Sequence, residues 1–163
     1  MRDGPVVANN TPLVALSMLG RLGLLRDLFG EVLIPEAVRD EFLAIDRASR
    51  EAMLAAVSPG ISMVAVQNRR RALAYFGLDR GESEVLALAE ERNARLVLID
   101  EWKGRQYAKR LGFPLTGTVG VLLLAKEQAL VTSVAELLAD LAKNGFRLDA
   151  ALVSRALETA GER

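Results

Sequence analysis

The sequence contains no cysteine and no histidine. This excludes disulfide frameworks, thiolate nucleophiles and the usual zinc ligands, together with the side chain that enzymes use most often as a general base. Any metal site must be built from oxygen atoms, which suits magnesium, manganese or calcium. No apolar run reaches the roughly 18 residues of a membrane span, and no signal segment opens the chain. We therefore predict a soluble, cytoplasmic protein without membrane attachment.

Neither sign of charge dominates the sequence. The 21 basic and 21 acidic residues cancel, so any binding to nucleic acid must come from a local patch rather than from the net charge. Hydrophobic residues make up 51% of the 163 residues, which is enough to bury a core and makes disorder a poor explanation. A chain of this length predicts one domain, residues 1–163.

Short apolar runs alternate with stretches of helical spacing. The runs that predict strands cover residues 5–8, 31–34, 61–66, 96–99 and 113–115. The stretches that predict helices cover residues 13–28 (two short helices), 35–45, 48–57, 85–92, 102–111, 119–128, 134–143 and 150–159. Residues 67–71 are predicted to be an exposed connection. This alternation predicts an α/β domain of three layers with a mainly parallel central sheet.

Three acidic positions stand out by their placement. Glu41 lies beside the apolar stripe of its helix, Glu82 follows Gly81 before an apolar helix, and Asp100 ends the strand 96–99 with Glu101 behind it. Ligand crevices open at the carboxyl edge of parallel sheets, so acids distant in sequence can meet there. Clustered carboxylates repel unless a cation neutralises them. Magnesium or manganese in such a cluster polarises a phosphodiester and activates water.

Each of these residues also has a purely structural explanation. Glu82 can complement a helix dipole, Asp100 can cap the helix that follows it, and Glu41 can be a solvated flanking residue. Thr11 and Thr118 both follow strand ends, where a hydroxyl can cap a helix or orient a metal-bound water. Spacing alone leaves both explanations open at every one of these positions.

The predicted helix after Asp100 is basic. Its charged residues are Lys103, Arg105, Lys109 and Arg110. They can hold the phosphates of a nucleic acid beside the acids, or they can form a solvated face. Trp102, the only tryptophan, can stack on an unpaired base or pack against a neighbouring element. Residues 117–120 lack the lysine and spacing of a phosphate-binding loop, which argues against a nucleotide switch.

Several short stretches, taken together, resemble one known family. They cover residues 9–13, 34–38 with Glu41, 81–84, 98–101 with 103–105, and 116–122. Their residues and order resemble the PIN-domain superfamily, and specifically its branch of small prokaryotic PIN-like proteins called DUF3368. The resemblance extends over nearly the whole chain, with the core of the domain at about residues 5–158.

The resemblance implies a PIN fold and metal-dependent cleavage of single-stranded RNA, with Mg²⁺ or Mn²⁺ as cofactor. It also implies a homodimer and a small antitoxin protein as partner, because many relatives are toxins of VapBC-type pairs. Carried over by position, the catalytic residues are Glu41, Glu82, Asp100 and Thr118. The metal ligands are Glu41, Glu82 and Asp100 with Asn9 and Glu101. We predict nucleic-acid contacts at Thr11, Lys103, Arg105, Lys109 and Arg110.

One position departs from the family pattern. The first acid of the family normally ends the opening strand, and Asn9 stands there in this sequence. An amide oxygen can ligate a metal but carries no charge, so three carboxylates instead of four should weaken magnesium binding. The alternative function is therefore a non-catalytic PIN-like module that binds RNA or a protein partner. A small-molecule-binding α/β domain is a more distant alternative.

Overall fold

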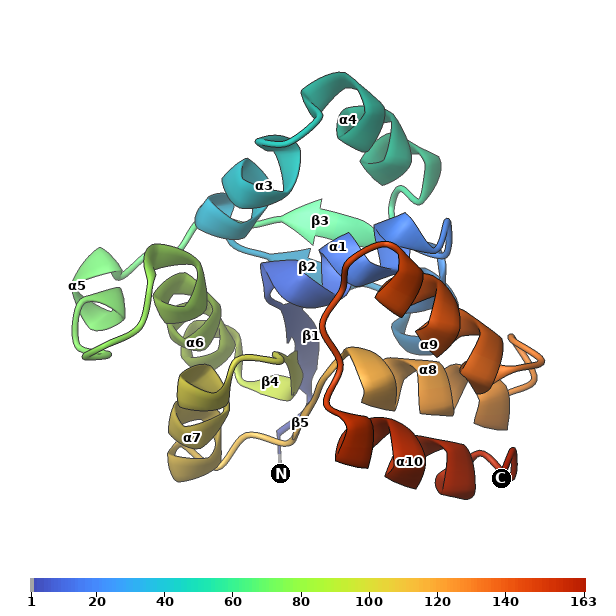
Figure 1. The fold of residues 1–163 in the computed structure, drawn as a ribbon. Helices are drawn as coiled ribbons and strands as arrows, with labels where there is room; N and C mark the ends of the chain where they lie inside the picture. The colour runs from blue at the N-terminus through green and yellow to red at the C-terminus, as the bar shows by residue number, and fades with distance from the viewer. Residues whose placement is uncertain (1) are drawn as a thin grey trace.

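The computed structural model describes residues 2–163 and shows three layers, with a sheet between helices (Figure 1). The sheet has five strands in the order β3-β2-β1-β4-β5. Every pairing in it is parallel. The strands are β1 (Gly4–Ala8), β2 (Val32–Ile34), β3 (Ile61–Met63), β4 (Ala94–Leu98) and β5 (Leu115–Thr116). The predicted three-layer α/β fold is confirmed.

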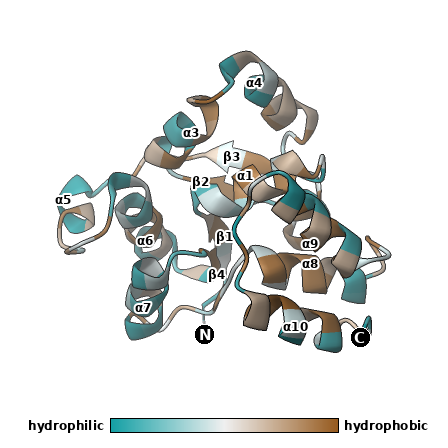
Figure 2. Cartoon of the chain, viewed as in Figure 1, coloured by the Kyte–Doolittle hydropathy of each residue, from teal (hydrophilic) through white to brown (hydrophobic). Residues whose placement is uncertain are grey.

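Helices connect the strands and cover both faces of the sheet. On one side lie α6 (Arg80–Arg92) and α7 (Trp102–Arg110), and on the other lie α8 (Thr118–Glu127), α9 (Val134–Lys143) and α10 (Ala150–Thr159) (Figure 1). The remaining helices are α1 (Asn10–Met18), α2 (Leu24–Phe29), α3 (Glu36–Leu43), α4 (Arg47–Ala56) and α5 (Arg69–Ala72). Figure 2 shows α8 as mostly hydrophobic and α7 as mostly hydrophilic. No helix within residues 2–163 combines the length and apolarity needed to cross a membrane.

The central strands β1 and β4 form the middle of the core. Val6, Val7 and Leu98 are fully buried, and burying one such aliphatic side chain contributes roughly 1.5–3 kcal/mol. The chain runs outward from β1 through β2 to β3 and then returns to β4, so the strand order reverses between β1 and β4. In an open parallel sheet, this reversal leaves a crevice at the carboxyl ends of the two strands.

Several predicted boundaries are wrong, and two of them lie next to the predicted site residues. Residues 81–84, placed before the helix predicted at 85–92, form the first turn of α6, because Asp79 caps this helix by accepting a hydrogen bond from the Glu82 backbone N–H at 2.8 Å. The last strand covers Leu115–Thr116 instead of 113–115, since its pairing with the end of β4 sets its position. The first correction places Glu82 inside a helix, where its side chain is directed by the helix geometry.

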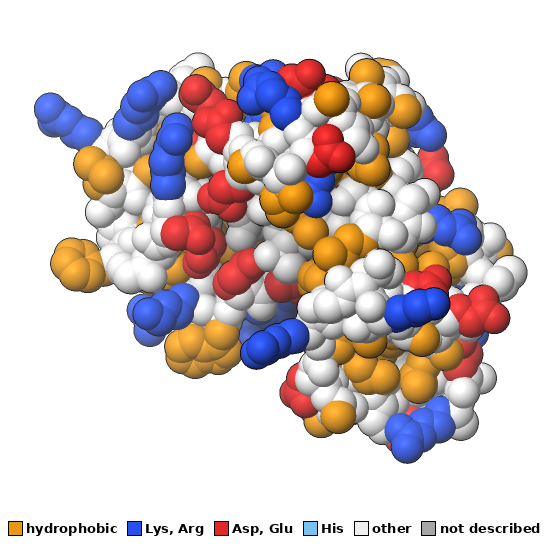
Figure 3. Space-filling model, turned by 45° about the horizontal axis from the view of Figure 1, so that its top comes forward, with side chains coloured by type: hydrophobic (Ala, Val, Ile, Leu, Met, Phe, Trp, Pro, Cys, Tyr) orange, Lys and Arg blue, Asp and Glu red, His pale blue; other side chains and the backbone are white. Residues whose placement is uncertain are grey.

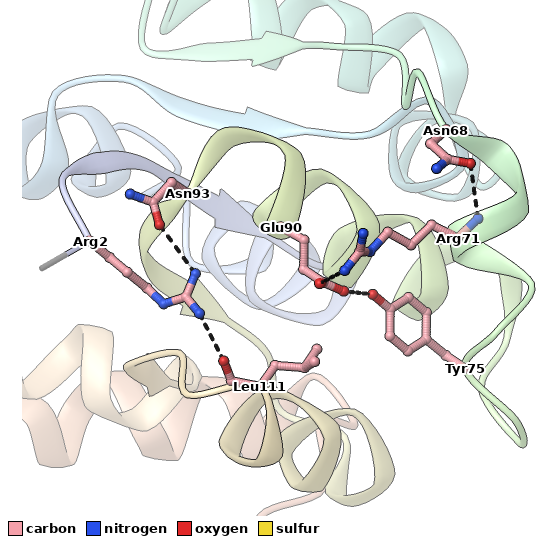
Figure 4. A network of polar contacts seen from close by, with 7 residues as sticks. All are labelled: Arg2, Asn68, Arg71, Tyr75, Glu90, Asn93 and Leu111. Atoms are coloured by element: carbon pink, nitrogen blue, oxygen red, sulfur yellow. Dashed lines mark hydrogen bonds and ion pairs between the residues drawn. The ribbon is translucent and has the colours of Figure 1, made fainter.

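The segment around α5 is attached to the layer that contains α6 and α7. It was predicted as an exposed connection but forms a short helix. Glu90 of α6 accepts hydrogen bonds from Arg71 and Tyr75 (Figure 4). Tyr75 packs edge-to-face on Tyr107 of α7 with ring centroids 5.7 Å apart. The Tyr107 hydroxyl donates to the backbone carbonyl of Phe76 at 2.9 Å, so the loop after α5 is fixed to both helices.

Candidate active site

The ends of β1, β4 and β5 bring five of the predicted residues to one edge of the sheet. Asn9 and Thr11 follow β1, Asp100 and Glu101 follow β4, and Thr118 follows β5. Asn9 is 4% exposed and Thr118 is 1% exposed, so these polar side chains need partners inside the protein. Amide, hydroxyl and carboxylate groups therefore meet at the crevice that the strand reversal creates.

Asp100 is held by Thr118. Its Oδ1 accepts the Thr118 backbone N–H at 2.9 Å, and its Oδ2 accepts the Thr118 hydroxyl at 2.6 Å. Burial raises the pKa of Asp100, and the two hydrogen bonds oppose that shift. Gly117 permits the close approach, because a Cβ there would overlap Asp100 Oδ1. The helix-capping explanations are wrong for both residues: α7 begins after Glu101, and Thr118 uses its hydroxyl for Asp100.

Glu101 connects the end of β4 to the end of β1. Its Oε2 accepts a hydrogen bond from Asn9 Nδ2 at 2.9 Å, and its Oε1 accepts one from the Thr11 hydroxyl. The predicted cap by Thr11 is wrong, because α1 already begins at Asn10. Asn9 thus presents a donor to Glu101, where an acid, which the resemblance implies at this position, would present a second negative charge.

Glu41 and Glu82 approach from two helices. Glu82 lies in the first turn of α6 and is 9% exposed. Its Oε2 would lie 3.4 Å from a Cβ on Gly104 of α7. Glu41 lies near the end of α3, and its Oε1 would lie 2.5 Å from a Cβ on Gly81. Both carboxylates therefore rest against helix backbone where a glycine leaves room.

The carboxylates influence one another across this crevice. Burial raises the pKa of Glu82 to about 7, with further contributions from Asp79, Glu101 and Glu41. Burial also raises the pKa of Glu41, helped by the charges of Asp79 and Glu101. The charge of Glu101 adds to the raised pKa of Asp100 as well. Glu101 is the shared neighbour, and Figure 3 shows acidic side chains in a row that runs into a hollow.

The donor set suits a hard divalent cation. Glu41, Glu82, Asp100 and Glu101 supply only oxygen atoms, and their crowding leaves negative charge that Mg²⁺ or Mn²⁺ can neutralise. As the side chains stand, no three acids within residues 2–163 are arranged to hold a metal ion. Hydrogen bonds to the neighbouring side chains occupy Asp100 and Glu101. A bound cation would therefore have to compete with these hydrogen bonds, and the metal ligands stay a prediction.

The four basic residues of α7 lie in two different environments. Lys103, Lys109 and Arg110 are exposed. Arg105 is partly buried and donates from Nη1 to the Ile99 carbonyl at 2.9 Å. Its charge opposes the raised pKa of Asp100. Arg105 therefore supports the end of β4 beside the acids, and the other three form an open basic surface.

Two residues of the site were missed in the sequence. Asp79 raises the pKa of both Glu41 and Glu82, and an earlier start for its helix would have identified it as a cap. Arg147 lies between α9 and α10 and lines a crevice of about 300 Å³ together with Asp100 and Glu101. It belongs to no motif, since only the return of the C-terminal helices to the sheet edge brings it there.

The raised pKa values predict how stability depends on pH without added divalent cation. The folded protein retains protons that the unfolded chain releases above pH about 4.3, so the free energy of unfolding should fall as the pH rises toward 7. We expect a loss of roughly 1–2 kcal/mol between pH 5 and 8, allowing for solvent screening. Urea unfolding in EDTA measures it, and Glu82→Gln should flatten the curve. Stability that rises across this range would contradict the prediction.

A parallel sheet with acids at the reversal of its strand order defines a class of α/β proteins with a polar site at that edge. The family model DUF3368, described as a PIN domain, matches residues 5–162. The chain therefore belongs to this PIN-domain family, and the resemblance seen in the sequence is confirmed. No significant match was found among curated proteins.

Proposed function

We propose that the protein is a metal-dependent endoribonuclease that cleaves single-stranded RNA. The observation that carries this proposal is the position of Glu41, Glu82 and Asp100 near Glu101, where burial and the charge of Glu101 raise the pKa of all three. Membership in the PIN-domain family supports it, because PIN domains typically use divalent metal ions. The proposed cofactor is Mg²⁺ or Mn²⁺.

The residues of the crevice have different roles in the proposed reaction. Glu41, Glu82, Asp100 and Glu101 would hold the cation, with Asn9 as a neutral oxygen ligand. A divalent ion bound there supplies the charge that polarises the phosphodiester and activates water. Thr118 fixes both oxygens of Asp100. Positive charge to hold the phosphates of the RNA comes from Arg147 on one wall and from the exposed basic residues of α7.

The test is cleavage of a labelled single-stranded RNA in Mn²⁺, in Mg²⁺ and in EDTA. We expect cleavage with Mn²⁺, slower cleavage with Mg²⁺ and none in EDTA, and we expect an RNA duplex to resist. Glu82→Gln, purified in the same way, controls for contaminating nuclease and should be inactive. Lack of cleavage by the wild type and by Asn9→Asp, over several metals and RNA sequences, would contradict the proposal.

A second candidate function is a non-catalytic PIN-like module that binds RNA or a protein partner. The observation that favours it is the pair of hydrogen bonds from Asn9 and Thr11, which satisfies Glu101 without a metal. Isothermal titration with Mn²⁺ separates the two functions, because submillimolar binding would argue against a site without a metal. The toxin role, the antitoxin partner and the homodimer stay predictions from the family.

A further inference from the structure

Trp102 is not packed against a neighbouring element, which corrects one of the two explanations open in the sequence. It is 72% exposed, and Phe76 is 89% exposed. Large aromatic side chains contribute much of the stability of a core when they are buried. Two rings in solvent do not stabilise the fold in this way. Single exposed hydrophobic residues are common on soluble proteins, so position rather than exposure decides what these rings can do.

The start of α7, beside the acids, lies near the loop that carries Phe76. Trp102 is the first residue of α7 and directly follows Glu101. Lys103 extends from α7 toward the loop after α5, where its Nζ lies 3.8 Å from the position of a Cβ on Gly77. Phe76 is the preceding residue of that loop. The lysine therefore lies between the two segments that carry the aromatic residues.

The loop that carries Phe76 is held in place rather than free. The Tyr107 hydroxyl donates to the Phe76 carbonyl at 2.9 Å. Tyr75 packs on Tyr107 and donates to Glu90 of α6 (Figure 4). A ring presented from a fixed backbone loses little entropy when a ligand stacks on it, so this arrangement favours binding.

We propose that Trp102 and Phe76 are a stacking platform for unpaired RNA bases, with Lys103 contacting a phosphate between them. The inference rests on the proposed function for its substrate class, single-stranded RNA. It adds the path that the RNA strand takes beside the acids. Every base offers a π-face, so such a platform selects unpaired bases without selecting a sequence. The balanced net charge makes local contacts of this kind necessary for RNA binding.

The order of the side chains favours RNA over a protein partner. Protein interfaces place a continuous apolar core at the centre of the patch and deplete it of charged residues, lysine in particular. Here an exposed lysine, Lys103, reaches from the segment that carries Trp102 toward the segment that carries Phe76. Aromatic groups separated by a cation match the alternation of base and phosphate along a single strand.

The tryptophan itself provides the measurement, because the chain contains only one. In EDTA, titration with an unstructured oligoribonucleotide should quench the fluorescence of Trp102 and saturate. An abasic oligomer of equal length and an RNA duplex should leave the fluorescence nearly unchanged. Equal quenching by the abasic oligomer, or none by any RNA, would overturn the proposal. A change produced only by a protein partner would do the same.

Affinity of the variants separates stacking from charge. By anisotropy of a labelled oligoribonucleotide, Trp102→Ala should weaken binding about five- to 100-fold and Phe76→Ala somewhat less, whereas Trp102→Phe should stay near wild type. Ile45→Ala, which truncates another exposed hydrophobic residue, is the matched control and should bind normally. Unchanged affinity in Trp102→Ala would overturn the platform. Quenching without cleavage would uphold the platform and oppose the nuclease, and cleavage without quenching would do the reverse.

Discussion

Asp100→Asn should lower Mn²⁺-dependent RNA cleavage roughly 100-fold or more and remove submillimolar Mn²⁺ binding. The change removes one negative charge and almost no volume. Oδ1 can still accept the Thr118 backbone N–H, and the Thr118 hydroxyl can accept a hydrogen bond from the new amide. The fold should therefore be retained, and the loss of cleavage should reflect the missing carboxylate rather than unfolding. Cleavage of labelled RNA and isothermal titration with Mn²⁺ measure the two effects.

Two further variants sharpen this result. Asp140→Asn removes an exposed acid on α9 and should leave both cleavage and Mn²⁺ binding unchanged. Thr118→Val removes the hydroxyl that fixes Asp100 and should weaken Mn²⁺ binding by about 10- to 100-fold, as expected for a group that orients a metal ligand. Wild-type cleavage by Asp100→Asn would show that the reaction takes place elsewhere on the protein.

Asn9→Asp should tighten Mn²⁺ binding by about tenfold or more and raise cleavage, while it destabilises the protein without metal. Asn9 Nδ2 lies 2.9 Å from Glu101 Oε2, so the substitution sets two carboxylates against each other at a position that is 4% exposed. A cation between them would turn this repulsion into attraction. Titration with Mn²⁺ and thermal unfolding with and without Mn²⁺ measure both consequences.

A double substitution tests whether the effects of Asn9→Asp arise from its contact with Glu101. In Asn9→Asp combined with Glu101→Gln, the amide and the carboxylate exchange places, so a hydrogen bond can form again. Stability without metal should return toward the wild-type value, and the gain in Mn²⁺ affinity should shrink. Equal Mn²⁺ affinity in Asn9→Asp and the wild type would exclude position 9 from the metal site.

The sequence predicted the scaffold because local patterns determine it. Apolar runs of three to six residues between helical stretches predicted a sheet between helix layers, and the structure confirms this. The acids at element ends were also visible, since Asp100 follows its strand directly. The gathering of Glu41 and Glu82 beside Glu101 follows from how α3, α6 and α7 pack, and spacing along the chain only suggested it.

The hydrogen-bond partners of the site could not be predicted, because each depends on a long-range contact. Thr118 looked like a helix cap, yet its hydroxyl reaches Asp100 only because β5 pairs with β4. Thr11 meets Glu101 only because β1 lies beside β4. Arg147 reaches the crevice because the C-terminal helices return to the sheet edge. Trp102 is exposed because no other element covers the start of α7.

The crowded carboxylates favour cation binding but lower the thermal stability of the protein without metal. Glu41, Glu82 and Asp100 are proposed metal ligands, and their raised pKa values indicate that their ionisation weakens the metal-free fold. Laboratory evolution for thermal resistance alone should therefore replace these positions early, with neutral residues of similar shape. The packing of the hydrophobic core would be unaffected. The evolved protein would be more stable but would no longer bind the cation.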